Sequence, residues 1–231
     1  MKKRTRRNLV VSAGIVIVLG AAAVIIGPRI YVAYASGSAQ APPALTAPPA
    51  AGASGERVGD LSGNWVVGPH SYAGYRVSEV LEGQRLEVTG RTSKVSGELD
   101  ASGLTLDSAT VTVQVGSIAT TEPARDAYFR DVALNTAKYP TATFTLAHPI
   151  KANPAVTGKP QTFTADGQLA MHGVTRNVSF QLQAELTAGG GQVVGQIPIT
   201  FADYGVAAPS LGFVTVQKSG DVEFLLNLVK Q

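Results

Sequence analysis

The chain has 231 residues and no cysteine, which leaves room for one β-domain with extensions but excludes disulfide bonds, thiolate metal sites and cysteine nucleophiles. Six of its 19 basic residues lie before residue 30, so the formal net charge of +3 does not describe the rest of the chain. From Glu56 onward, 13 basic residues stand against 16 acidic ones, and this net charge of −3 argues against a nucleic-acid partner.

A basic tail and a long apolar segment open the chain. Residues 1–8 carry five Lys and Arg, whereas residues 9–28 are uncharged, rich in Val, Ile, Ala and Leu, and nearly long enough to span a bilayer. Because the positive charges come first, we expect a single-pass plasma-membrane anchor with a cytoplasmic N-terminus and an extracytoplasmic domain. The alternative is secretion after cleavage following Ala35, since Ala33-Tyr34-Ala35 resembles a signal-peptidase site.

Residues 36–57 are predicted to be a linker. They consist largely of Ala, Pro, Gly and Ser, and A-P-P-A occurs twice, at residues 41–44 and 47–50. Such a composition cannot build a core and favours extended, polyproline-like conformers. At about 3 Å per residue, this stalk would hold the domain up to roughly 60 Å from the membrane.

Residues 58–231 consist of short alternating apolar and polar runs, which is typical of strands with one buried face. Residues 178–186 show this alternation most clearly, with Val, Phe, Leu, Ala and Leu separated by Ser, Gln, Gln and Glu. Further strands are expected within residues 73–78, 110–115, 142–146, 193–201 and 222–228. About eight such strands predict an all-β, antiparallel barrel, which leaves no exposed sheet edge.

One helix interrupts the strands, between Pro123 and Pro140. Proline is tolerated in a first helical turn, and the second proline forces the helix to end before it. Ala124, Tyr128 and Val132 recur at i, i+4 and i+8, so we expect them to form the apolar face. We interpret this charged helix as a cap over one end of the barrel.

The sequence shows no pattern that indicates catalysis or metal binding. His70, His148 and His172 are not spaced as ligands on one element, and each lies beside Pro or Gly, as turn residues do. No G-x-S-x-G motif occurs, and the glycines at 189–191 lack the lysine of a phosphate-binding loop. We therefore expect a non-enzymatic protein without a cofactor.

Several linked motifs follow one another along residues 58–231. They are G-Y-R-V-S-E (74–79), V-T-G-R-T-S-K-V-S-G (88–97), R-D-A-Y-F-R (125–130), Y-P-T-A-T-F (139–144), G-Q-L-A-M-H-G-V-T-R-N-V (167–178) and F-A-D-Y-G-V (201–206). Taken together, they resemble the YceI-like family. The resemblance implies a lipocalin-like, eight-stranded barrel with a helical segment near one mouth. It also implies a secreted or periplasmic protein that holds a polyisoprenoid chain. One departure is Ala170-Met171-His172, where the family usually has threonine, isoleucine and arginine, so no ligand contact is assigned to that turn.

By this resemblance, we expect the domain to bind, store or transport an isoprenoid-type lipid, such as a quinone or a polyprenyl lipid, in the bacterial cell envelope. Each isoprene unit that leaves water contributes roughly 3–4 kcal/mol, so no specific polar contact is needed. The apolar side chains expected to line the lumen are Tyr75, Val77, Val113, Ala142, Phe144, Leu146, Phe180, Phe201 and Phe224. The alternative is that these side chains fill a solid core, and that the domain is an envelope module that binds a partner protein.

Four arginines are considered either as ligand contacts or as partners in structural ion pairs. Arg125 and Arg130 either meet a polar or phosphorylated head group at the mouth, or pair locally with the aspartate that follows each of them. Arg76 and Arg91 are expected on the exterior or rim of the barrel, in salt bridges, with no ligand role.

Overall fold

The computed structural model describes residues 39–46, 57–58, 60–81, 83–153, 155–156, 159–187, 190–210 and 214–231. The predicted basic tail (1–8) and anchor (9–28) lie outside these residues, as does most of the linker. Within the described ranges, no helix is long and apolar enough to cross a membrane.

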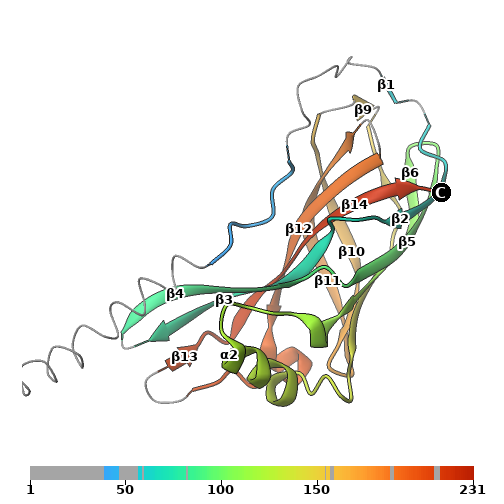
Figure 1. Cartoon of the computed structure of the whole chain (residues 1–231). Coiled ribbons are helices and arrows are strands. Elements are labelled where there is room, and N and C mark those ends of the chain that lie inside the picture. Colours follow the sequence, from blue (N-terminus) through green and yellow to red (C-terminus); the bar gives the residue numbers. More distant parts are fainter. Residues whose placement is uncertain are drawn as a thin grey trace, which may run out of the picture.

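Strands dominate the described part of the chain (Figure 1). They are β1 (Arg57–Val58), β2 (Gly63–Val67), β3 (Tyr72–Leu81), β4 (Gln84–Thr92), β5 (Val95–Ser102), β6 (Thr105–Gln114), β7 (Thr141–Leu146), β8 (Ile150–Lys151), β9 (Ala155–Val156), β10 (Gln161–Met171), β11 (Val174–Thr187), β12 (Gly190–Thr200), β13 (Val214–Val216) and β14 (Ser219–Lys230). Four short helical segments accompany them: η1 (Val115–Ser117), α2 (Pro123–Tyr128), the π-turn η2 (Phe129–Ala133) and η3 (Phe201–Tyr204).

The principal sheet closes into an antiparallel barrel, as the sequence predicts. Eight strands follow one another around it in the order β12, β11, β10, β7, β6, β5, β2 and β14, and β14 pairs back with β12. That closing pair is long, running from Gly191 opposite Leu228 to Thr200 opposite Ser219. The β3–β4 hairpin prolongs the wall beyond the ring, and β13 pairs with β3.

The alternation of side chains along each strand separates lumen from exterior. On β12 and β14, which pair side by side, the lumen side carries Val193, Ile197, Phe224 and Leu226. The residues at the alternate positions, such as Val194 and Leu225, therefore face outward, because successive side chains of a strand point to opposite faces. The period-two alternation thus separates the two faces, although the outer face of these two strands also carries buried apolar residues.

The predicted helix exists and covers one end of the barrel, far from β1 and β9 (Figure 1). Pro123 occupies its first turn, next to Glu122, and the following strand begins just after Pro140. Beyond the π-turn, Leu134 is only 6% exposed and belongs to the apolar core at this end of the barrel.

The predicted apolar face of this helix is wrong. Ala124 is exposed, and Val132 is 62% exposed. The buried position is instead Asp126, whose carboxylate accepts hydrogen bonds from the Thr120 amide (2.9 Å) and hydroxyl (2.8 Å). Because α2 spans only six residues before the π-turn changes its periodicity, an i, i+4, i+8 pattern cannot describe one continuous face.

Residues 39–46 of the predicted linker lie against the outer wall of the barrel (blue trace in Figure 1). These residues cannot form a hydrophobic core of their own. Their backbone can nevertheless form hydrogen bonds with the wall of the barrel, which has its own core.

Candidate ligand cavity

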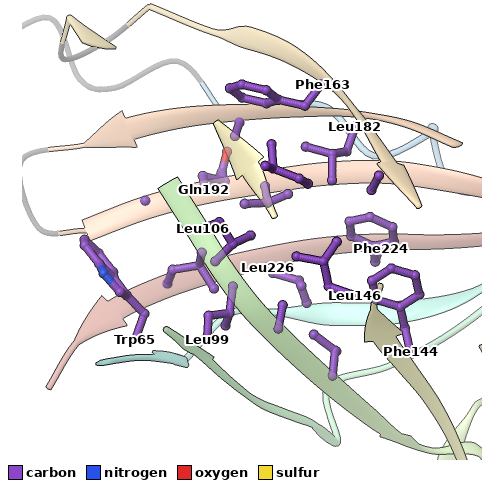
Figure 2. A pocket seen from close by; sticks show the side chains of 18 of the residues that line it. Trp65, Leu99, Leu106, Phe144, Leu146, Phe163, Leu182, Gln192, Phe224 and Leu226 are labelled. Atoms are coloured by element: carbon purple, nitrogen blue, oxygen red, sulfur yellow. The ribbon is translucent and has the colours of Figure 1, made fainter. Parts of the chain in front are cut away.

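The barrel encloses a cavity of about 250 Å³ whose lining is almost entirely apolar. Figure 2 shows aromatic and leucine side chains converging on it from several strands: Leu99, Trp65 and Phe224 come from the neighbouring strands β5, β2 and β14, and Phe144 comes from β7. Trp65 satisfies its only polar group locally, since its indole N–H donates to the Leu61 carbonyl at 2.9 Å. The lumen therefore offers dispersion contacts and the exclusion of water.

The cavity occupies the half of the barrel remote from α2. Its outer end, here called the mouth, is lined by Leu61, Leu104 and the exposed Lys159. At the helix end, by contrast, the lumen is filled by a packed cluster that includes Val115, Leu134, Met171 and Tyr204. The cavity therefore runs from the mouth toward the helix and is closed there by this core.

Aromatic rings line the lumen because they lie flat against glycines of the neighbouring strand. Gly195 pairs directly with Phe224, and a Cβ at Gly195 would stand 2.6 Å from Phe224 Cζ. The Phe144 ring lies over Gly167 diagonally, since Gly167 pairs with Leu146 and a Cβ there would meet the ring. Phe180 then makes edge-to-face contacts with both rings, at centroid separations of 5.4 Å to Phe144 and 6.0 Å to Phe224. The missing Cβ atoms leave room at the wall for rings that would otherwise project into the lumen.

Of the nine apolar residues that the sequence suggested for the lumen, six line the cavity: Val113, Ala142, Phe144, Leu146, Phe180 and Phe224. Their role in binding stays a prediction.

The other three lie at or beyond the closed end. Tyr75 stacks on Phe129 at 4.9 Å, and burial raises the pKa of its hydroxyl above the ordinary value. Val77 belongs to a second apolar cluster, which is formed by side chains of the β3–β4 hairpin. Phe201 packs against this cluster.

Sequence reasoning missed several lining residues, among them Trp65, Leu99, Leu106, Phe163, Leu182 and Leu226. A signal for two of them was present. Phe163 belongs to an alternating series with Ala165 and Leu169, and Leu182 lies within the clearest strand. Trp65 carried little signal, because β2 is only five residues long.

The two arginines considered for a head group are not among the residues that line the cavity. Arg125 Nη2 donates to Glu79 Oε1 at 3.1 Å, and Glu79 is buried, so this pair ties α2 to β3. Asp126 bonds to Thr120, as described above, and not to Arg125 as the local-pairing interpretation expected. Contact of Arg125 or Arg130 with a head group stays a prediction.

The histidines occupy turns or bends, as expected. His70 and His172 have φ values of 63° and 53°, and His172 Nδ1 donates to the Tyr204 carbonyl at 2.9 Å. Its ring meets Tyr139 edge-on, and the preceding Met171 belongs to the closed-end core. The turn that departs from the family pattern thus lies away from the mouth. In the described part of the chain, no three His, Asp or Glu side chains form a group that could hold a metal ion.

Comparison with known proteins places this architecture in a recognised group. The YceI-like domain family matches residues 65–228, which is well over half of the chain. A polyisoprenoid binding domain from Saccharophagus degradans, implicated in plant cell wall breakdown, has a similar structure, with a TM-score of 0.58 at 18% identity over 74% of this chain and 99% of that one. BcnA from Burkholderia cenocepacia gives a TM-score of 0.53 at 17% identity, over 68% and 96% of the two chains. At these identities the two likenesses concern the fold alone. No curated protein sequence matches this chain.

Proposed function

Because the chain belongs to the YceI-like domain family, we propose that it binds an isoprenoid-type lipid, a quinone or a polyprenyl lipid, inside its barrel. The observation that carries this proposal is the apolar cavity walled by Phe144, Phe180 and Phe224. The polyisoprenoid binding domain from Saccharophagus degradans, which shares the fold, supports the ligand class. The activity is binding, storage or transport, with no chemical step.

The cavity volume sets how much of the ligand lies inside. An apolar cavity of about 150 Å³ holds benzene. In proportion, the 250 Å³ present here would take roughly ten carbon atoms, or two isoprene units. At about 0.8 kcal/mol per methylene, this burial offers about 8 kcal/mol before the cost of association. A longer tail would extend through the mouth.

The polarity of the lumen sets the direction of binding. A head group placed at the closed end would lose its hydrogen bonds to water among apolar side chains such as Met171 and Leu134, and in the packed cluster there only the buried Tyr204 hydroxyl could replace one of them. The chain end of the lipid therefore points toward α2, and the head group lies at the mouth, where Leu61 and Lys159 border the solvent, or beyond the mouth when the tail is longer than the cavity.

The site of action follows from the N-terminal sequence. Residues 9–28 would anchor the protein in the plasma membrane, with residues 1–8 in the cytoplasm and the barrel outside. An N-terminus at Ser36 in the mature protein would instead indicate a secreted barrel.

Organic extraction of the purified full-length protein, followed by mass spectrometry, tests the proposal. We expect an isoprenoid-type lipid in stoichiometric amounts, and a clear reduction in a parallel preparation of Ala142→Phe, which narrows the lumen. Equal amounts of lipid in the two preparations would show that the lipid was carried over from membranes during purification and was not bound in the lumen. Absence of lipid, together with no uptake of added geraniol, would favour the alternative of an interaction module.

A further inference from the structure

The outer wall of the barrel holds residues 39–46, here called the strap, through hydrogen bonds at both ends. At the first end, the Gln40 amide donates to Thr89 Oγ1 at 3.0 Å, and the Gln40 carbonyl accepts from Arg76 Nη2 at 2.5 Å. Arg91 donates to the Gln40 side-chain oxygen at 2.7 Å and to the Ala41 carbonyl. Two guanidinium groups thus recognise the backbone and the one long side chain at this end.

These guanidinium groups are held in place by a buried carboxylate. Glu223 is 0% exposed and accepts from Arg76 Nε at 3.0 Å and from Arg91 Nε at 2.6 Å. Each arginine therefore donates its Nε to Glu223 and one or both Nη groups to the strap. Arg76 Nη1 lies instead 3.9 Å from Glu87 Oε2, and Arg91 also lies over the Tyr72 ring at 4.4 Å. Arginine suits such a site, because its donors form a rigid planar fork.

The second end of the strap is recognised by an oriented amide. Gln192 Nε2 donates to Asn227 Oδ1 at 2.9 Å, which turns its oxygen toward the strap. That oxygen accepts from both the amide (2.7 Å) and the hydroxyl (3.0 Å) of Thr46. Between the two ends, Pro43 shares a surface hollow with Val194, an outward-facing residue that is only 5% exposed.

We propose that this outer face is a recognition site for an extended, proline-containing peptide, and that its occupant is the chain's own strap. Consecutive prolines favour a polyproline helix, which makes no internal hydrogen bonds and so leaves its carbonyls free to accept from arginine. The second A-P-P-A, at residues 47–50, lacks both the preceding glutamine and the following Leu-Thr. The residues that flank the first A-P-P-A therefore favour docking of this repeat over docking of the second one.

Docking of the strap also sets the length of the tether, by which we mean the free chain between the membrane anchor and the barrel. This consequence rests on the proposed membrane anchor. With the strap bound, only residues 28–39 separate the anchor from the barrel, a reach of about 34 Å in extended form. With the strap free, residues 28–57 would reach about 90 Å up to the β1–β9 pair, of which the linker (36–57) supplies roughly 60 Å. Docking would thus keep the barrel close to the membrane from which a lipid must be taken.

Hydrogen exchange of the full-length protein in nanodiscs, read by mass spectrometry, tests the docking. We expect the Gln40 and Thr46 amides, which donate to the wall, to exchange at least tenfold more slowly than in a synthetic peptide of residues 39–46. The double variant Pro42→Gly/Pro43→Gly should abolish this protection, whereas its matched control, Pro48→Gly/Pro49→Gly, should retain it. Arg91→Lys, which keeps the charge beside Glu223 but removes the fork, should weaken protection as well.

Exchange of wild-type residues 39–46 at the peptide rate would overturn the proposal, as would equal loss of protection in the two double-proline variants. A single label tests the tether, because the chain has no cysteine of its own. Thr145→Cys provides the labelling site. The distance from this label to the nanodisc lipids should lengthen in Pro42→Gly/Pro43→Gly but not in the control, Pro48→Gly/Pro49→Gly. Protected residues 39–46 in a protein that does not associate with nanodiscs would refute the anchor and leave the docking intact.

Discussion

Enlarging Ala142 is the change that most directly separates a lipid-binding lumen from a solid core. Ala142 lines the cavity, pairs across strands with Val113, and lies two residues before Phe144 on the same face of β7. Replacing it with Phe adds a benzene-sized ring to the lumen. Such a ring needs about 150 Å³ and would therefore take more than half of the 250 Å³ present.

The expected effects on affinity and stability have opposite signs. Displacing about six ligand carbons at about 0.8 kcal/mol each removes roughly 5 kcal/mol of binding free energy, more than a thousandfold in Kd. Filling cavity volume at about 24 cal/mol per Å³ contributes up to roughly 3–4 kcal/mol to folding, and strain costs about 1–3 kcal/mol. Ala142→Phe should therefore bind far less ligand while remaining at least as stable as the wild type.

Calorimetric titration with geraniol, which carries two isoprene units, measures the affinity, and urea denaturation measures the free energy of unfolding. Thr145→Phe is the matched control, because Thr145 lies on the same strand, faces outward and is exposed. It should change neither quantity appreciably. An Ala142→Phe protein that unfolds, or one that binds geraniol as the wild type does, would refute the assignment of this space as the binding cavity.

Three further predictions concern the walls. Gly195→Ala should force the Phe224 ring into the lumen, because the new Cβ would lie 2.6 Å from that ring, and geraniol should bind at least tenfold more weakly in the same titration. Glu223→Gln should lower the free energy of unfolding by about 3–5 kcal/mol in urea, since it leaves two arginines without their buried carboxylate, whereas the exposed Glu98→Gln should have little effect. Burial raises the pKa of Tyr75, so its neutral form is favoured by folding, and stability should be complete below about pH 10 and decline as the pH rises above it. Urea denaturation at a series of alkaline pH values should show a shallower decline for Tyr75→Phe, and an unchanged slope would contradict the burial argument.

The sequence alone predicted six of the strands in the described part of the chain, their two faces and the limits within which the helix lies, because these depend on local properties. It did not single out β2, β4, β5 or β10. The period-two alternation that separates Phe180 from Gln181 is the same physical constraint that places one in the lumen and the other outside. Pro123 and Pro140 bracket the helical segment through their fixed φ and the restriction on the preceding residue. The placement of Arg76 and Arg91 outside, in ion pairs, is confirmed as well.

Only the tertiary structure decided which inward residues enclose space and which fill it. Tyr75 and Phe224 both face inward in alternating strands, yet one lies under the helix and the other at the cavity. The partner of Arg76 and Arg91 is likewise distant, since Glu223 follows them by 147 and 132 residues. Alternation determines the face of a side chain but not its height along the barrel, which depends on the register between strands far apart in the chain. That register is also what assembles two arginines, a glutamate and a glutamine into a site for the strap.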